Sequence, residues 1–284
     1  RLRINESLND AEPRQRIAPV GGLRLEFGDF RQAVEPVEAV AAAVDAALSR
    51  PFRFGFDAPL VRAWLFLEST ETAVFVLVLH HLVCDGWSSE IFLRELQEAY
   101  AGALAGQAPD WPPLPLRYVD YAAWQREYLA GPACEAEKIR WRERMTPLPE
   151  PINLPIDKPR PAMLSQQGDS IELHLDARRL DGLKALAREA GLTLFPVLAA
   201  LVKTFLYRHT GQTDLVVGVP VANREDEALQ GVIGFFVNTL PLRDRLDAGA
   251  GFARLVGEIG HTWRETLADQ LYPLEMLVDD LKVP

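Results

Sequence analysis

The chain has 284 residues, of which 48% are hydrophobic and 25% charged, a composition typical of folded globular proteins and sufficient for one large domain or two subdomains. Its formal net charge of −10 disfavours binding to nucleic acid or to an anionic membrane through an overall basic field. The two cysteines, Cys84 and Cys134, do not imply a disulfide framework, and no apolar run approaches the roughly 20 residues that cross a bilayer. We therefore expect a cytoplasmic protein, with no nucleic acid and no membrane among its partners.

The patterns of the first 145 residues predict strands and helices in mixture. Alternating apolar and charged residues at 23–27 predict a short strand. The segment 36–48 begins with proline and carries one apolar stripe, which is typical of a helix. Apolar runs at 60–68 and 73–79, separated by a polar turn, predict an antiparallel hairpin. Further helices are expected over residues 88–104, 118–129 and 133–145.

A proline-rich segment follows these elements. Six of the 21 prolines lie between residues 146 and 161, a density that excludes a helix or a central strand. We therefore predict an N-terminal subdomain at 1–145, an extended linker at 146–169 and a C-terminal subdomain at 170–284.

The last third of the chain again alternates between the two kinds of pattern. Gly191 and Gly211 suit left-handed helix ends, and Thr193 suits an N-cap. Strands are expected over residues 170–175 and 215–221, a glycine turn followed by a strand over 231–242, and helices over 176–190, 194–209, 252–267 and 273–281. This alternation predicts a mixed α/β protein with crossover units in its second half.

The most informative stretch is HHLVCDGWS at residues 80–88, directly after the apolar run 73–79. Because side chains alternate along a strand, the two histidines are expected to point to opposite faces, one toward a cleft and one into packing behind it. Gly86 permits a turn, and Ser88 is placed to cap the next helix. A histidine beside an apolar strand is more often a core residue than a functional one. The sequence shows no HExxH or Cys-His cluster, which disfavours a metal site.

The complete string HHxxxDGWS resembles the core motif of the condensation domains of nonribosomal peptide synthetases, in the chloramphenicol-acetyltransferase-like superfamily. The chain is similar to this family along nearly its whole length. The other similar stretches resemble the tail of RHExLRTxF at 1–4, YxDYAxW at 117–124, LPxDxPRP at 154–161, IGxFVNTxxxR at 233–243 and the end of HQDxPFE at 273–275. Asp269, Leu271 and Leu274 depart from the last motif, where His, Asp and Phe are usual. Because flanking family motifs are missing, we expect the chain to be an incomplete view of the domain.

The resemblance implies a fold and a reaction. The fold is α/β, with two chloramphenicol-acetyltransferase-like subdomains in a V arrangement, mixed sheets flanked by helices, and His81 near the middle of a tunnel between them. The reaction is amide formation, in which the amine of an acceptor aminoacyl thioester attacks a donor acyl or peptidyl thioester. The implied partners are donor and acceptor peptidyl carrier protein domains and an adjacent adenylation domain. The domain itself binds no cofactor, and 4′-phosphopantetheine arrives on the carriers.

The motif residues receive roles on this basis. His81 is expected to face the cleft, either as the general base or as the group that positions the attacking amine, and the two roles carry equal weight. The backbone N–H of Gly86 is a candidate oxyanion contact. His80 is expected to be structural. Ser88 is a helix cap rather than a nucleophile, because no Gly-x-Ser-x-Gly elbow surrounds it.

The remaining site residues are expected to have structural roles. Asp85 fixes the loop, and the resemblance favours an ion pair between it and Arg243. Trp87 either walls the tunnel or belongs to the core. Asn238 orients the loop of its motif. Cys84 is assigned no thiol chemistry.

Alternative functions remain open from the sequence. One is a stand-alone acyltransferase of the same superfamily that uses coenzyme A, and another is a non-catalytic module that recruits a partner enzyme. An epimerase branch shares HHxxxDG, whereas a heterocyclising branch would carry DxxxxD in place of the histidines. The intact histidine motif argues against the recruiting module, and DGWS together with the LPxDxPRP and IGFFVNT stretches favours the condensation branch. A donor residue of L configuration is expected.

Overall fold

The computed structural model describes residues 2–5, 14–17, 23–53, 60–159, 161, 163, 165 and 168–283, and only the backbone of the first two segments. It divides into two compact units. The first is Arg1–Val119 with Arg224–Phe236, and the second is Asp120–Asn223 with Val237–Pro284. Strands β1 (Leu2–Asn5) and β2 (Arg14–Ile17) pair antiparallel in the first unit. The motif side chains expected at 1–4 lie outside the described residues.

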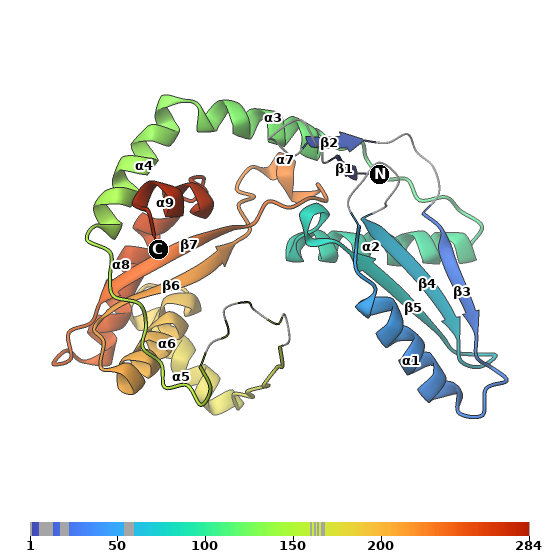
Figure 1. The fold of residues 1–284 in the computed structure, drawn as a ribbon, viewed down its shortest axis with the longest axis horizontal. Coiled ribbons are helices and arrows are strands. Elements are labelled where there is room, and N and C mark those ends of the chain that lie inside the picture. Colours follow the sequence, from blue (N-terminus) through green and yellow to red (C-terminus); the bar gives the residue numbers. More distant parts are fainter. Residues whose placement is uncertain are drawn as a thin grey trace. The chain divides into compact units, whose positions relative to one another are not determined.

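The first unit is built on a three-stranded sheet with the order β3-β4-β5. Strands β4 (Val61–Leu67) and β5 (Ala73–Leu79) form the predicted antiparallel hairpin, and β3 (Leu25–Asp29) runs parallel to β4. Helix α1 (Pro36–Ser49) makes the crossover between the parallel strands and packs on the sheet (Figure 1). The buried side chains between helix and sheet belong to Val40, Ala47, Trp64, Phe66 and Val76.

Two more segments complete the first unit around the end of β5. A short 3₁₀ turn, η1 (His81–Val83), leads from β5 into helix α2 (Gly86–Leu104). The segment Arg224–Phe236 belongs to this unit although it follows β6 in the chain, and it contains the short helix α7 (Glu227–Gln230). Helix α3 (Tyr118–Leu129) begins in the first unit and continues in the second.

The second unit packs its helices against a two-stranded antiparallel sheet of β6 (Asp214–Val221) and β7 (Asn238–Arg245). Alternate residues of β7 are buried, and Leu240 and Leu242 enter two neighbouring core clusters on that face. Helices α8 and α9 both contact β7, and α6 packs on α8. The helices of this unit are α4 (Pro132–Met145), α5 (Ala177–Glu189), α6 (Leu194–Thr210), α8 (Phe252–Leu267) and α9 (Leu274–Leu281).

The division between the units differs from the predicted boundary in the proline-rich segment. Helix α4 joins the second unit because Trp141 and Met145 are buried with Leu240 and Tyr272. The segment Arg224–Phe236 joins the first unit because its polar groups bond to the start of α2. The proline content did predict an extended segment, since residues 147–159 form no helix or strand. The division of the chain into units depends instead on contacts between residues far apart in the sequence.

Most predicted elements are confirmed, and two expectations are wrong. Residues 170–175 form no strand, and Ile171 and Leu173 are 97% and 85% exposed, so their alternating pattern has no sheet to join. The parallel crossover lies in the first half, β3-α1-β4, whereas β6 and β7 are antiparallel. The predicted left-handed conformations at the helix ends are confirmed, with φ of 65° at Gly191 and 71° at Gly211.

No single helix among the described residues is long and apolar enough to cross a membrane. Helices α5 and α6 reach the required length and hydropathy only as a pair, which is bent by 110°. The V arrangement of the two subdomains stays a prediction.

Candidate functional site

The histidine motif lies where strand β5 ends and helix α2 begins. The backbone N–H of His80 donates to the carbonyl of Leu60 at 2.9 Å, and its ring Nδ1 accepts from the N–H of Leu82 at 3.1 Å. Its ring also meets the Phe52 ring edge-on, with centroids 5.4 Å apart. The half-buried His80 thus fastens the turn to the segment before β4, which is consistent with a structural role.

His81 opens the 3₁₀ turn and is exposed. Because β5 ends at Leu79, strand alternation does not set the directions of the two histidines, and that part of the prediction is wrong. The imidazole meets the Phe235 ring edge-on, with centroids 5.2 Å apart and planes at 85°. No described residue hydrogen-bonds to this imidazole, so both of its ring nitrogens are open to a ligand.

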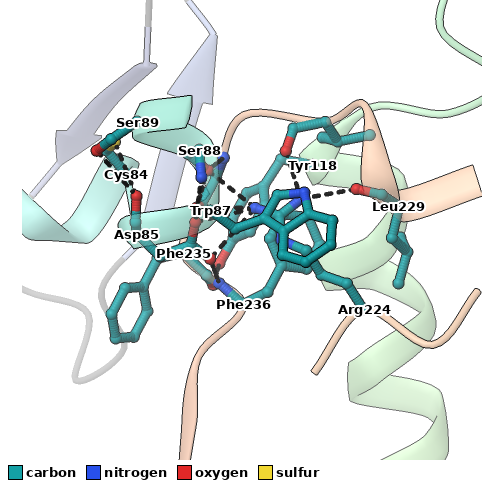
Figure 2. A network of polar contacts seen from close by, with 12 residues as sticks. Cys84, Asp85, Trp87, Ser88, Ser89, Tyr118, Arg224, Leu229, Phe235 and Phe236 are labelled. Carbon is teal, nitrogen blue, oxygen red and sulfur yellow. Dashed lines mark hydrogen bonds and ion pairs between the residues drawn. The ribbon is translucent and has the colours of Figure 1, made fainter. Parts of the chain in front are cut away.

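Asp85 is the centre of a buried polar network (Figure 2). It is 2% exposed and forms the N-cap of α2, accepting from the N–H of Ser88 at 2.8 Å. The N–H of Phe236 donates to its other oxygen at 3.1 Å, and Arg224 Nη2 lies 3.1 and 3.2 Å from the two oxygens. Burial alone would raise the pKa of Asp85, but the hydrogen bonds from Ser88 and Phe236 and the charge of Arg224 outweigh it and hold the pKa below its ordinary value.

The predicted partner of Asp85 is therefore wrong: the arginine is Arg224, not Arg243. Arg243 forms a bidentate pair with Asp214 in the second unit, at 2.9 and 2.7 Å, and donates to the carbonyl of Arg144 at 3.0 Å. The hydrogen bonds to Asp214 raise the pKa of Arg243. In the sequence Arg224 stands shortly after the apolar strand that ends at Val221, and nothing in that position marks it as the partner of Asp85.

Ser88 does more than the helix cap that was predicted, and the cap itself is Asp85. The hydroxyl of the fully buried Ser88 donates to the carbonyl of Gly234 at 2.9 Å and accepts from its N–H at 3.0 Å. It also accepts from Arg224 Nη2 at 2.9 Å. A Cβ at Gly234 would collide with the Tyr118 ring, so only glycine permits this close approach.

Gly86 and Trp87 form the first turn of α2. Gly86 is exposed, and its backbone N–H belongs to the helix start, where no carbonyl of the same helix can accept it. Trp87 is 41% exposed, and its Nε1 donates to the carbonyl of Gln230 at 2.9 Å. Trp87 is therefore not a fully buried core residue: it ties α2 to the segment that carries Arg224.

A family model described as a condensation domain matches residues 1–284. The chain belongs to the condensation-domain family. It is 41% identical over 260 residues to a linear gramicidin synthase protein of Brevibacillus parabrevis, a match that covers 92% of this chain and 3% of the relative. It is 37% identical over 283 residues to phosphinothricin tripeptide synthetase of Streptomyces viridochromogenes, covering 99% of this chain and 26% of the relative. The condensation domain thus spans a small part of these synthetases.

Solved structures agree with this assignment. The X-domain from teicoplanin biosynthesis superposes with a TM-score of 0.88 at 27% identity, covering 100% of this chain and 62% of that one. The first condensation domain of the calcium-dependent antibiotic synthetase gives a TM-score of 0.78 at 25% identity, covering 99% and 65%. These likenesses confirm the predicted α/β fold class of the chloramphenicol-acetyltransferase-like type.

In this condensation domain Asn238 organises the segment that precedes α9. Its buried Nδ2 donates to the carbonyls of Gln270 and Tyr272, both at 2.8 Å. Its Oδ1 accepts from the N–H of Leu274 at 3.2 Å. Asn238 therefore orients the backbone of the following motif, residues 269–275, within the second unit.

Asp269, one of the departures from the family motif, is a buried ion-pair centre. It is 1% exposed and pairs with Arg140, whose Nε lies 2.9 Å from Oδ1, and with Arg144. Its carbonyl accepts from Trp141 Nε1 at 2.9 Å. The aspartate thus binds α4 to the end of α8, and the departure has a structural reason.

The described residues offer no group of three or more His, Cys, Asp or Glu side chains able to hold a metal ion. Cys84 is buried, with its Sγ 3.4 Å from the carbonyl of Asp85. The reactive group that the motif presents is the exposed imidazole of His81, which stands shortly before the start of α2 in the chain.

A double-mutant cycle tests the ion pair. We expect Asp85→Asn and Arg224→Gln each to lower the free energy of unfolding by about 3–5 kcal/mol, because each leaves a buried group without its partner. The double variant should lose at least about 1 kcal/mol less than the sum of the single losses. Urea unfolding of the purified protein measures all three.

The control cycle combines Asp85→Asn with Arg243→Gln, which should be additive within about 0.5 kcal/mol. Coupling of Asp85 to Arg243 rather than to Arg224 would contradict this network.

The lowered pKa of Asp85 predicts a pH dependence of stability. Because the carboxylate titrates at lower pH in the folded than in the unfolded state, its contribution is complete above the unfolded pKa and is lost as the pH falls through the folded one. We expect the free energy of unfolding to fall more steeply between about pH 5 and pH 2 in the wild type than in Asp85→Asn. Equal slopes in urea titrations at several pH values would refute this.

Proposed function

We propose that this condensation domain joins a donor acyl or peptidyl thioester to an acceptor aminoacyl thioester, both carried on peptidyl carrier proteins. The observation that supports this proposal is the exposed imidazole of His81, held on a short turn directly before the first free N–H groups of α2. An acid-base group followed closely in the chain by backbone donors of a helix start suits an acyl transfer through a charged tetrahedral intermediate.

In the proposed reaction the amine of the acceptor attacks the thioester carbonyl of the donor. A C–N bond forms and the C–S bond breaks, so that the donor chain moves to the acceptor and the thiol of the donor arm is released. The nitrogen loses one proton, and the leaving sulfur gains one. Holding both tethered reagents in line supplies much of the acceleration.

His81 acts on the attacking amine. With no hydrogen bond to a described residue, either ring nitrogen is able to accept from the amine N–H. As general base His81 removes the proton, and as a positioning group it only directs the lone pair at the carbonyl. Substitution by glutamine separates these two roles, because an amide accepts a hydrogen bond but does not take up the proton.

Gly86 provides the complementary contact. Its N–H lies at the N-terminus of α2, where the helix dipole and unpaired donors favour negative charge. The developing oxyanion of the thioester carbonyl is the group that such a donor stabilises.

The partners follow from the same proposal. Peptide synthetases among the relatives support donor and acceptor carrier domains with 4′-phosphopantetheine arms as the carriers of the substrates, and an adjacent adenylation domain. A cytoplasmic location is part of the proposal.

A second candidate is favoured by one structural comparison. The X-domain in its complex with OxyB from teicoplanin biosynthesis superposes with a TM-score of 0.87 at 27% identity. A chain of this fold that binds a partner enzyme and forms no amide would fit that likeness equally well. Product formation by the full-length protein separates the two candidates.

Replacement of His81 tests the catalytic role. If His81 transfers the proton, both His81→Ala and His81→Gln should lower the rate of amide formation by about 10²–10⁴-fold. If it positions the amine by a hydrogen bond, His81→Gln should retain most of the rate, because the amide still accepts a hydrogen bond. Mass spectrometry of the acceptor carrier after mixing with a loaded donor carrier measures the product.

The matched control is His261→Ala on α8, an exposed histidine of the second unit, which should keep the wild-type rate. A wild-type rate in His81→Ala would overturn the proposal, as would the absence of product with every matched pair of loaded carriers.

Gly86→Ala tests the oxyanion contact separately. A Cβ at Gly86 meets nothing within 4 Å, and alanine is the better helix residue, so stability should stay equal or rise by up to about 1 kcal/mol. The rate should fall by about 10-fold or more, since the methyl group obstructs a thioester that approaches the N–H. An unchanged rate with normal thermal unfolding would remove Gly86 from the mechanism.

A further inference from the structure

The backbone around Phe235 is fixed at three successive residues. Ser88 holds the residue before it, through both backbone groups of Gly234. The carbonyl of Phe235 itself accepts from the Tyr118 hydroxyl at 2.8 Å. The N–H of the residue after it donates to Asp85, so little freedom is left to the Phe235 backbone.

The neighbouring Phe236 shows which way each ring faces. Phe236 is 2% exposed, with the Arg224 guanidinium 3.9 Å above its ring and the Tyr118 ring edge-on at 5.1 Å. Phe235 is half-buried, and its ring contacts the imidazole of His81 instead. The buried network thus holds Phe236 inside, whereas the ring of Phe235 contacts His81. Figure 2 shows Phe235 and Phe236 beside the network.

This contact matters because His81 has no polar partner among the described residues. A catalytic histidine is ordinarily oriented by a hydrogen bond to its second ring nitrogen. Here the edge-on contact with Phe235, at 5.2 Å and 85°, is the restraint on the ring plane. An aromatic neighbour restrains the plane without competing with a substrate amine for either nitrogen.

We propose that Phe235 is a positioning residue that holds the His81 imidazole in its productive orientation. The inference rests on the amide-forming function proposed above. The residue that orients the imidazole thus lies on the segment Arg224–Phe236, far from the histidine motif in sequence.

The kinetic test uses Phe235→Leu and Phe235→Tyr in the full-length protein with loaded carriers. Phe235→Leu keeps an apolar side chain but loses the ring, and should lower kcat by about 3- to 10-fold while KM changes by less than about twofold. Phe235→Tyr keeps the ring and should retain the wild-type kcat. The matched control is Phe75→Leu on β5, a 42% exposed phenylalanine, which should change neither constant.

A second readout does not depend on activity. In protein with ¹³C-labelled histidine, the relaxation of the His81 ring carbons, assigned by their loss in His81→Gln, should show a more mobile ring in Phe235→Leu and an unchanged one in Phe235→Tyr and Phe75→Leu. Unchanged ring mobility or an unchanged kcat in Phe235→Leu would overturn the role of Phe235 alone. Absence of product from the wild type would instead overturn the proposed function, and the positioning role with it.

Discussion

The structure of the site depends on one buried carboxylate. Asp85 is almost completely removed from water, a state that costs several kcal/mol unless its charge and lone pairs are satisfied. The structure satisfies them with Arg224 and with two backbone N–H groups, one at the start of α2 and one at Phe236. Because the same carboxylate caps a helix and binds a segment about 150 positions away, the turn that carries His81 has little freedom of its own.

Local patterns predicted most elements because their causes are local. Helices α3 and α8 begin and end at the predicted residues, and the hairpin of β4 and β5 follows from two apolar runs and a polar turn. The arginine that meets Asp85 was not predictable in this way. Asp214 and Arg245 face each other in the β6–β7 ladder, which brings Arg243 within reach of the Asp214 carboxylate, and the two side chains pair there. Because this strand register, a property of the folded chain, engages Arg243, the arginine that pairs with Asp85 is Arg224.

The buried Asp269 illustrates a signal that the sequence did contain. An aspartate in place of the usual histidine needs a cation when it is buried, and Arg140 and Arg144 stand four positions apart on one face of α4. The i,i+4 spacing of two arginines in a predicted helix therefore indicated an acidic partner. What the sequence lacked was the position of that helix, since its apolar residues pack with Leu240 and Tyr272 of the second unit rather than with the elements before it.

Rigidity and reactivity are assigned to different groups in this site. The polar side chains that build the network, Asp85, Ser88 and Arg224, are buried and bond mainly to each other and to backbone. The exposed imidazole of His81 takes no part in these bonds. If it did, the protein would engage one of the two ring nitrogens. Restraint by an aromatic ring leaves both nitrogens to a substrate, and it makes the orientation of the imidazole depend on the same segment that neutralises Asp85.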